Sequence, residues 1–387
     1  MSENIQVPKG WEVIEFCNIA NLRNKKYIPN QNENIKCIEL ECIEKENGNL
    51  LYCINSNTQK STKNYFYKND VLYGKLRPYL KKYFYATFDG VCSTEIWVFN
   101  ATNKIDSYYL FLIIQSNKFN HYTNISTGTR MPRADWNIVS NLPVLLPPLE
   151  EQKKIAEILS LWDKAIEQTK ELIAYKEKQK KGLMQALLTG KKRLQGFTDE
   201  WKTYTINELG EVKTGKTPST TKAEYYNGDI MFITPTDIKN KFTSNTDRYL
   251  TNAGLKKSIF IPKNSILITC IASIGKNTIN SESCACNQQI NAIIPNDSNY
   301  YEYLYYHISY NTPYIEKFSG NSATAIINKS TFEEIDITIP PLDEQKAIAD
   351  ILSSADEEIN LLNKQLELYT EQKKGLMQNL LTGKVRV

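Results

Sequence analysis

The chain has 387 residues, 23% of them charged, and a formal net charge of +4, so it is long enough for two or more domains. It contains no apolar run near the ~20 residues that a membrane-spanning helix requires, and its N-terminal residues show no signal-peptide pattern. Its eight scattered cysteines lack zinc-knuckle spacing and it has only two histidines, which argues against a metal site or disulfide framework and favours a cytoplasmic protein with free thiols.

Charge is unevenly distributed along the chain. Counting Lys and Arg against Asp and Glu, residues 1–194 sum to about +8 and residues 195–387 to about −4. The small total is weak evidence for nucleic-acid binding. If a chain with this balance binds DNA tightly, a partner is expected to supply part of the positive surface.

Residues 1–146 are expected to form a first globular region. Alternating apolar patterns bounded by Gly and Pro predict short strands, and a continuous apolar run predicts a helix. In chain order we expect a strand and turn at Gly10–Ala20, an alternating segment at Lys68–Thr87, a strand at Gly90–Asn100, a helix at Ser107–Phe119, a basic loop at Ser126–Trp136 and a strand within Val139–Leu149.

Residues 147–194 are expected to form one long helix, and residues 340–387 repeat it. The two copies align without a gap and are identical at roughly half of their positions, and such self-similarity dictates the architecture. Each copy opens with Pro-Pro and acidic residues, which suit a helix start, and ends with Thr-Gly, which suits a stop. A helix of about 38 residues is roughly 57 Å long, although Gly182 and Gly375 weaken the prediction for its last turns.

Apolar residues recur within each copy in alternating steps of four and three. This heptad stripe requires a partner helix. We favour pairing of the two helices within one chain, and a coiled-coil homodimer is the alternative. The stripe includes Ile155, Leu159, Trp162 and Ile166 in the first copy and Ile348, Leu352, Ile359 and Leu362 in the second.

Residues 195–339 repeat the layout of the first globular region with little of its sequence. Lys263–Thr278 can be laid without a gap on Lys68–Tyr83, and Cys286–Ile294 falls where Val91–Phe99 fell. A shared scaffold with different loops is the arrangement expected of two domains with different specificities.

The order of these segments carries a family resemblance. A globular region is followed by a PPLxEQKxIAxIL helix ending KKGLMQxLLTGK, and both then recur. Over its whole length the chain resembles the specificity subunit of a type I DNA restriction-modification system. The segments G-K-x-R-P-Y-L-K-K and S-I-G-K-N are also similar to ones in the target recognition domains of that family.

The resemblance implies an α+β fold with a pseudo-two-fold internal repeat. Two α/β target recognition domains would each read half of a split double-stranded DNA sequence. They would be separated by two long helices that form an antiparallel coiled coil. The helical stripe would dock two modification subunits, which methylate adenine, and restriction or motor subunits would join them. Whether the chain self-associates through exposed heptad faces when it is isolated from these partners stays open from the sequence.

Physical reasoning supports the same arrangement. Readers of two half-sites on one face of a duplex must be separated by about one helical turn, roughly 34–36 Å. A stiff pair of helices would act as a ruler, and its length would fix the gap between the half-sites.

Residues 210–217 match the nucleotide-binding pattern G-x-x-x-x-G-K-[ST] letter for letter. That motif needs a buried strand before it and a helix after it, so that backbone N–H groups and the helix dipole hold phosphates. Here Pro218 follows directly, without an amphipathic helix. We therefore favour a basic loop facing DNA over an ATP site, with a plain surface turn as the alternative.

Enzyme activity is not expected from this chain. A DNA adenine methyltransferase would need a glycine-rich cofactor loop and a [DNS]-P-P-[YFW] motif, but the two Pro-Pro pairs follow Leu146 and Ile339 and open helices. We find no clustered carboxylates with a lysine, as a nuclease would need. Catalysis is expected to lie in partner subunits, and no cofactor or metal is expected here.

Arginine is the commonest reader of guanine, lysine mostly neutralises phosphate, and Gln and Asn can pair with adenine. For each candidate, a solvated polar face or a side chain satisfied inside its domain is the alternative. The DNA-contact candidates are Lys75, Arg77, Lys81, Lys82, Arg130 and Arg133 in the first region, and Lys213, Lys216, Lys276, Gln288, Gln289 and Asn321 in the second.

Two other functions stay open from the sequence. The chain could be a structural coiled-coil scaffold that ignores DNA sequence, or a specificity module that serves a single fused methyltransferase–nuclease. Loss of the split target on deletion of residues 195–387 would separate the first from a recognition subunit. The sequence of the neighbouring gene would separate the second.

Overall fold

The computed structural model describes residues 7–125, 131–320 and 325–387. The chain divides into two units: unit 1 is Met1–Lys170 with Lys364–Val387, and unit 2 is Glu171–Asn363. Each unit therefore combines one globular region with a segment of each long helix. The two boundaries fall at equivalent positions of the two helical copies, so the internal repeat seen in the sequence is also the repeat of the structure.

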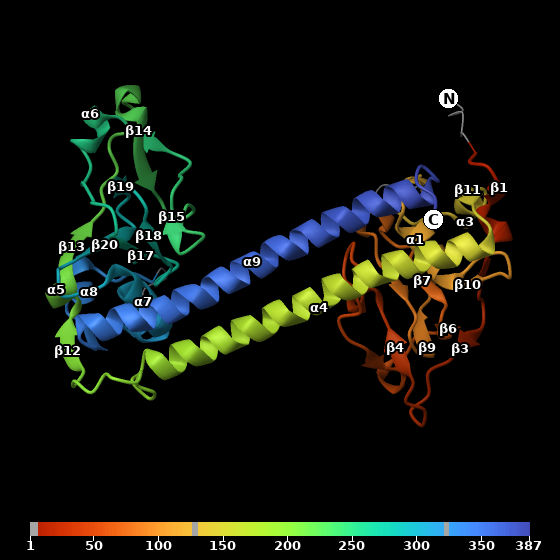
Figure 1. Cartoon of the computed structure of the whole chain (residues 1–387), viewed down its shortest axis with the longest axis horizontal. Coiled ribbons are helices and arrows are strands. Elements are labelled where there is room, and N and C mark those ends of the chain that lie inside the picture. The colour runs from red at the N-terminus through yellow and green to blue at the C-terminus, as the bar shows by residue number, and fades with distance from the viewer. Residues whose placement is uncertain (1–6, 126–130, 321–324) are drawn as a thin grey trace. The chain divides into compact units, whose positions relative to one another are not determined.

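The globular part of unit 1 contains one antiparallel sheet, one mixed sheet and a two-stranded ribbon (Figure 1). The antiparallel sheet has the order β2 (Ala20–Leu22), β10 (Ile96–Ala101), β7 (Val71–Gly74), β8 (Tyr83–Tyr85). The mixed sheet has the order β3 (Lys26–Tyr27), β6 (Lys63–Phe66), β9 (Gly90–Ser93), β4 (Lys36–Ile38), β5 (Ile54–Asn55), and the ribbon pairs β1 (Glu12–Glu15) with β11 (Pro143–Leu146). The helices are α1 (Ser107–Gln115), α2 (Asn117–Asn124) and α3 (Trp136–Val139).

Unit 2 also contains two sheets and a two-stranded ribbon, but its sheets have five and three strands where those of unit 1 have four and five. Its larger sheet has the order β13 (Gly210–Thr214), β20 (Ile290–Pro295), β17 (Ile266–Thr269), β18 (Asn277–Asn280), β15 (Phe242–Thr243). A second sheet has the order β16 (Tyr249–Leu250), β14 (Tyr226–Ile233), β19 (Cys284–Cys286), and a ribbon pairs β12 (Lys202–Thr205) with β21 (Asp336–Ile339). The helices are α5 (Ile206–Leu209), α6 (Asn252–Leu255), α7 (Tyr301–Ile315) and α8 (Lys329–Glu333).

One expected element differs in the structure. The apolar run predicted as a single helix is two helices, α1 and α2, which meet at Ser116. That residue has an extended backbone (ψ 151°), and its side chain accepts a hydrogen bond from the N–H of Phe119. Serine is a good N-cap because its oxygen satisfies an amide that the helix leaves unpaired, so it starts a new helix where the apolar pattern alone suggests continuity.

The two long helices are α4 (Leu149–Leu187) and α9 (Leu342–Leu381). Both continue through their internal glycines, which were expected to weaken the last turns. In unit 1, Lys373 of α9 lies 2.5 Å from Asp163 of α4, and in unit 2 Lys180 of α4 pairs with Asp356 of α9. A second contact in each unit fixes the direction: Glu151 near the start of α4 pairs with Arg386 beyond the end of α9, and Lys176 pairs with Glu358. Within each unit, the segments of α4 and α9 therefore run antiparallel. No helix in the described part of the chain is long and apolar enough to cross a membrane.

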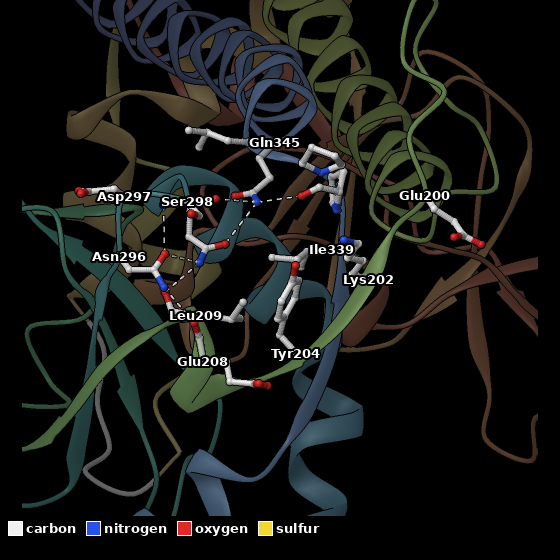
Figure 2. A pocket seen from close by; sticks show the side chains of 14 residues that line it. Glu200, Lys202, Tyr204, Glu208, Leu209, Asn296, Asp297, Ser298, Ile339 and Gln345 are labelled. Carbon is white, nitrogen blue, oxygen red and sulfur yellow. Dashed lines mark hydrogen bonds between the residues drawn. The ribbon is translucent and has the colours of Figure 1, made fainter.

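The Gln of each EQK motif attaches its helix to the adjacent domain. Gln152 accepts from the N–H of Asp106 and donates to the carbonyl oxygens of Lys104 and Pro147, at 2.9–3.0 Å. Gln345 likewise accepts from the N–H of Tyr300 (2.9 Å) and donates to the carbonyl of Pro340 (2.9 Å). Figure 2 shows Gln345 beside Ser298 and Asn296 at the edge of a polar cleft of about 460 Å³.

The Glu of each motif closes a second contact, which we call the Glu–Arg–Trp clasp. In unit 2, Glu344 accepts two hydrogen bonds from the Arg193 guanidinium (2.7 and 2.8 Å) and one from the Trp201 indole N–H (3.2 Å). The unit 1 clasp joins Glu151 to Arg386 (2.5 and 2.7 Å) and Trp11 (3.1 Å). Each clasp ties the end of one long helix to the start of the other.

Candidate nucleic-acid interface

In unit 1 the candidate site is built on the turn that joins β7 to β8, residues 75–82. Arg77 and Lys81 both adopt the left-handed backbone conformation, with φ of 53° and 47°. This conformation costs a residue with a Cβ roughly 1–2 kcal/mol and persists only where the surroundings hold it. Between them, Pro78–Leu80 form a single 3-10 turn, with Pro78 buried.

Backbone contacts hold this turn against residues 131–135, which precede α3 and which we call the late loop of unit 1. The N–H of Arg77 donates to the carbonyl of Pro132, and the N–H of Ala134 donates to the carbonyl of Lys75, both at 2.8 Å. Leu76 and Arg133 form an isolated antiparallel bridge between these contacts. Two predicted DNA-contact residues, Arg77 and Arg133, are thus brought onto adjoining strands of backbone, and both are exposed.

A carboxylate orients one of these arginines. Arg133 donates to both oxygens of Glu95 at 3.0 and 3.3 Å, and Glu95 also accepts from the N–H of Lys75 through its backbone carbonyl (2.9 Å). Such a forked pair fixes the plane of the guanidinium. Among the described residues, the Arg77 side chain has no hydrogen bond or ion pair.

The other predicted residues of unit 1 are not brought to the same point. Lys81 pairs with Glu46 at 3.5 Å. Lys82 donates to the carbonyl of Leu40 at 2.5 Å, and partial burial lowers the pKa of its ammonium group. Arg130 lies outside the described residues.

Unit 2 contains the same backbone arrangement after β17. The N–H of Ala272 donates to the carbonyl of Ala325 (3.0 Å), the N–H of Ile327 donates to that of Cys270 (2.9 Å), and Ile271 bridges Ile326. Ala272 again has a left-handed φ, 64°. We call the turn and the late loop together the frame. The chain contains it twice, as residues 75–82 with 131–135 in unit 1 and residues 270–276 with 325–327 in unit 2.

Strand register corrects the ungapped overlay of the two regions by one residue. The backbone carbonyl of Lys82 accepts from the N–H of Gly74 at 2.8 Å, and the backbone carbonyl of Lys276 accepts from the N–H of Thr269 at 2.9 Å. Lys82 and Lys276 are therefore equivalent. The turn of unit 2 is one residue shorter, a change that an overlay without a gap cannot represent. Register on β20 likewise makes Gln289 equivalent to Glu95.

The predicted residues of unit 2 lie around this frame. Gln289 accepts from the N–H of Cys270 through its backbone carbonyl (2.8 Å), and its side chain accepts from the Asn287 amide (3.0 Å). The exposed Gln288 accepts from the hydroxyl of Thr217 (2.7 Å). Three further placements are plain: Lys213 pairs with Glu211 (3.2 Å), Lys276 donates to the carbonyl of Pro235 (2.8 Å), and Asn321 lies outside the described residues.

The phosphate-loop-like segment does not have the geometry of a nucleotide site. The N–H groups of Gly215 and Lys216 donate to the backbone carbonyls of Ile290 and Cys286 at 3.0 and 2.9 Å, so they are not available to hold phosphate. A Cβ at Gly215 would lie 2.2 Å from the carbonyl oxygen of Asn287. The glycine is therefore needed for close backbone packing. Lys216 itself is exposed next to this packed turn.

The predicted helical stripe is divided between two environments. Ile155 and Leu159 are buried in the core of unit 1, together with Leu380 from α9. Ile348 and Leu352 are buried in the core of unit 2, together with Leu187, the last residue of α4, and Leu188, which follows it. Further along, Trp162 packs edge-on against Tyr369, with ring centroids 5.6 Å apart, and Ile166, Ile359 and Leu362 are half-buried.

A different set of apolar residues is exposed on the long helices. These side chains do not belong to the predicted stripe and have exposed fractions between 42% and 62%. They are Leu161, Leu172 and Tyr175 on α4 and Leu361 and Leu368 on α9.

Two residues beside the predicted DNA-contact candidates were not predicted from the sequence. Glu95, which orients Arg133, gave no signal because its partner lies 38 residues away in the chain. Tyr79 is 53% exposed on the turn, but only the basic residues of this segment were predicted to contact DNA. In the described residues, no group of three His, Cys, Asp or Glu side chains is placed to hold a metal ion.

The duplicated domains, each attached to two antiparallel helices and each exposing a differently charged loop pair, define a two-domain recognition protein. The model of the family described as "Type I restriction modification DNA specificity domain" matches residues 8–175 and 198–369. The chain belongs to this family. It is therefore a non-catalytic DNA-recognition subunit, because catalysis in type I restriction-modification systems lies in other subunits.

Named relatives agree with this assignment. The chain is 28% identical to the type I restriction enzyme HindI specificity subunit of Haemophilus influenzae, over 76% of this chain and 82% of that one. It is 30% identical to the MjaX specificity subunit of Methanocaldococcus jannaschii, over 74% and 69%. Among solved structures, the S subunit from M. genitalium (TM-score 0.63, 14% identity) and HsdS from Thermoanaerobacter tengcongensis (TM-score 0.51, 21% identity) share the fold, each over 98% of both chains.

Proposed function

We propose that this chain reads a bipartite double-stranded DNA target, with each globular region reading one half. The observation that carries the proposal is the frame built twice, with the same backbone contacts and different exposed side chains. One scaffold that presents two chemistries suits two different half-sites. The proposed target recognition domains are residues 1–146 and 195–339, joined by helical regions 147–194 and 340–387.

The proposed DNA contacts differ in role. Arg77 and Arg133 are candidates for base contact, because both are exposed and arginine pairs bidentately with guanine. Lysines 75, 81, 82, 213, 216 and 276 are candidates for phosphate contact, which positions the domain without reading sequence. Gln288, Gln289, Arg130 and Asn321 complete the proposed set.

We propose that the helices dock two adenine methyltransferase subunits and that restriction subunits join this assembly. The apolar residues exposed on α4 and α9 support this where they are neighbours, as Leu172 and Tyr175 are on adjacent turns, because grouped exposed apolar side chains favour a protein partner. Part of the positive surface for DNA would then come from the partners, as the small net charge suggests. An assembly that acts on cellular DNA would be cytoplasmic.

The test is co-expression with the neighbouring methyltransferase gene in a methylation-free host, followed by genome-wide mapping of methylated adenines. We expect one bipartite motif with a fixed gap, and no methylation when this chain is omitted. A continuous motif, or methylation that does not depend on this chain, would contradict the proposal and leave a structural scaffold as the better account.

A further inference from the structure

The two copies of the frame agree in backbone and differ in side chain. Four backbone contacts recur: the bridge, the two flanking hydrogen bonds, and the bond from the N–H of Lys75 or Cys270 to the start of β10 or β20. At equivalent places the exposed side chains are Arg77 and Ala272 on the turn, and Arg133 and Ile326 on the late loop. The backbone contacts of the frame are thus the same in both units, and the exposed side chains differ.

The turn position is strained in both units. A non-glycine residue occupies the left-handed region at Arg77 and again at Ala272, although the two residues share no side-chain chemistry. Strain of this kind persists only where surrounding contacts hold the backbone, and here the late loop supplies those contacts. The frame therefore holds the two variable positions together at a fixed spacing.

The chemistry presented by each unit is distinct. In unit 1, the Arg77 guanidinium is exposed, and Glu95 orients that of Arg133. Two exposed guanidinium groups suit the O6 and N7 acceptors of guanine. In unit 2, Ala272 is small and Ile326 is 44% exposed, which suits apolar contact such as the thymine methyl group.

Resting on the proposed function, we infer that the paired turn and late loop are the base-reading element of each unit. Residues 77 and 133 determine specificity in the half-site read by unit 1, and residues 272 and 326 do so in the half-site read by unit 2. Glu95 is a positioning residue that holds Arg133. The half-site of unit 1 contains guanine at the contacted position.

The decisive variant is Arg77→Gly. Glycine adopts φ of 53° without steric cost, so this change removes the guanidinium and relieves strain, which offsets the greater flexibility that glycine gives the unfolded chain. We expect a melting temperature close to that of the unchanged protein. In the co-expression and methylation-mapping experiment, one position of one half-site should relax, with discrimination falling on the order of 10- to 100-fold.

Two matched controls accompany it. Asn264→Gly makes the same change at another left-handed position (φ 63°), before the start of β17 and at the opposite end of that strand from the frame, and should leave the motif unchanged. Lys104→Ala removes an exposed positive charge from unit 1 beyond the far end of β10, on the order of 20 Å along that strand from the frame. It should leave the motif unchanged as well.

A second experiment transfers chemistry between the units. The double change Ile326→Arg with Gln289→Glu places in unit 2 the forked pair that Arg133 and Glu95 form in unit 1. Preference in the half-site of unit 2 should move toward guanine, while the other half-site stays as it was. A transfer that weakens methylation without changing either half-site would contradict the inference.

The outcomes separate the inference from the proposed function. If the unchanged chain gives no bipartite motif, the proposed function fails. If it gives one and Arg77→Gly leaves every position of it unchanged, the inference alone is overturned, even when methylation becomes slower, since phosphate contacts carry no sequence information. Relaxation confined to one half-site supports both.

Discussion

The Glu–Arg–Trp clasp shows what the glutamate of the repeated EQK motif does in the fold. Glu151 is only 8% exposed and accepts from both Arg386 and Trp11. The hydrogen bonds from Arg386 hold the pKa of the Glu151 carboxyl below its usual value. A carboxyl group whose pKa is lowered by folding stabilises the folded state at pH values above its usual pKa. This stabilisation is lost as the pH falls through the folded-state pKa.

Glu151→Gln is therefore expected to lower the stability of unit 1. The amide keeps an acceptor for Trp11 but loses the ion pair, which we expect to cost about 1–2 kcal/mol because Arg386 remains partly solvated. Thermal unfolding at neutral pH should occur some 3–6 °C lower. The difference from the unchanged protein should shrink in acid, where Glu151 itself becomes protonated.

Glu150→Gln is the control for this change. It removes the same charge from the same first turn, so the effect on the helix dipole is matched, but Glu150 is exposed and its one ion pair among the described residues is with Lys153. It should leave the melting temperature close to that of the unchanged protein. Equal effects of the two variants would show that the clasp adds nothing beyond the dipole.

His307 provides a second prediction at this scale. Its ring is 4% exposed beside the hydroxyl of Tyr303, and burial lowers the pKa of His307 to about 4. Between pH 6.5 and 4 the unfolded chain binds a proton that the folded chain does not, so stability falls as the pH falls. The loss should approach about 3 kcal/mol at pH 4.

His307→Asn should remove this acid sensitivity, because asparagine keeps a polar atom near the Nδ1 position but does not titrate. Urea midpoints at several pH values between 8 and 4.5 would measure the slope. His121, which is exposed, serves as the control: His121→Asn should leave the slope as it is. A slope unaltered in His307→Asn would assign the acid sensitivity to other groups.

At the scale of elements, each long helix packs partly against the other long helix and partly into a domain core. The sequence pattern does not distinguish these two kinds of packing. The heptad stripe correctly predicts two long helices that pair, because apolar spacing reports only that one face is buried. It cannot tell a partner helix from the helix's own domain, and Ile155, Leu159, Ile348 and Leu352 pack into the two domain cores. Surfaces left for partners must be sought among the exposed apolar residues.

Tyr175 and Leu368 are the best candidates for symmetric docking. They occupy equivalent positions of the two helical copies, and their exposed fractions are 62% and 55%. If two methyltransferase subunits dock through equivalent surfaces, Tyr175→Glu and Leu368→Glu should each weaken one of the two contacts. Stability should change by less than about 0.5 kcal/mol, as is usual for surface sites.

The mass of the complex with the methyltransferase, measured by light scattering, would read this out as a shift from two bound subunits toward one. Gln168→Glu, at an exposed polar position of α4, is the control and should leave both subunits bound. Leu352→Ala is the contrasting core variant and should cost about 2–5 kcal/mol of stability. Full occupancy in both glutamate variants would place the docking surface elsewhere.

At the scale of the whole molecule, the sequence predicts the doubled architecture because the two helical copies are still similar in amino-acid sequence. It does not predict which segments of the chain belong to which unit. Unit 1 takes its last segment, Lys364–Val387, from the far end of the chain, and contacts between residues such as Arg386 and Glu151 leave no local pattern. The candidate site is similar: its basic residues could be found by composition, but the frame that pairs Arg77 with Arg133 depends on contacts distant in sequence.

This sharing of segments changes what truncation would do. Residues 1–194 alone lack Leu380 and Arg386, which complete the core and clasp of unit 1. However, residues 183–193 read LMQALLTGKKR, nearly the same as LMQNLLTGKVR at 376–386, and in unit 2 Leu187 and Arg193 already have the corresponding roles. A second copy of the fragment could therefore supply the missing segment.

We expect the fragment 1–194 to form a homodimer in which each helix end completes the unit 1 fold of the other copy. With a methyltransferase present, such a dimer should direct methylation to a palindromic target made of two unit 1 half-sites. Light scattering measures the dimer, and Arg193→Ala, which removes the clasp donor, should raise its dissociation constant by about 10-fold or more. A fragment that is folded and monomeric would show that unit 1 does not need the segment at 364–387, and that the clasp does not hold the two helices together.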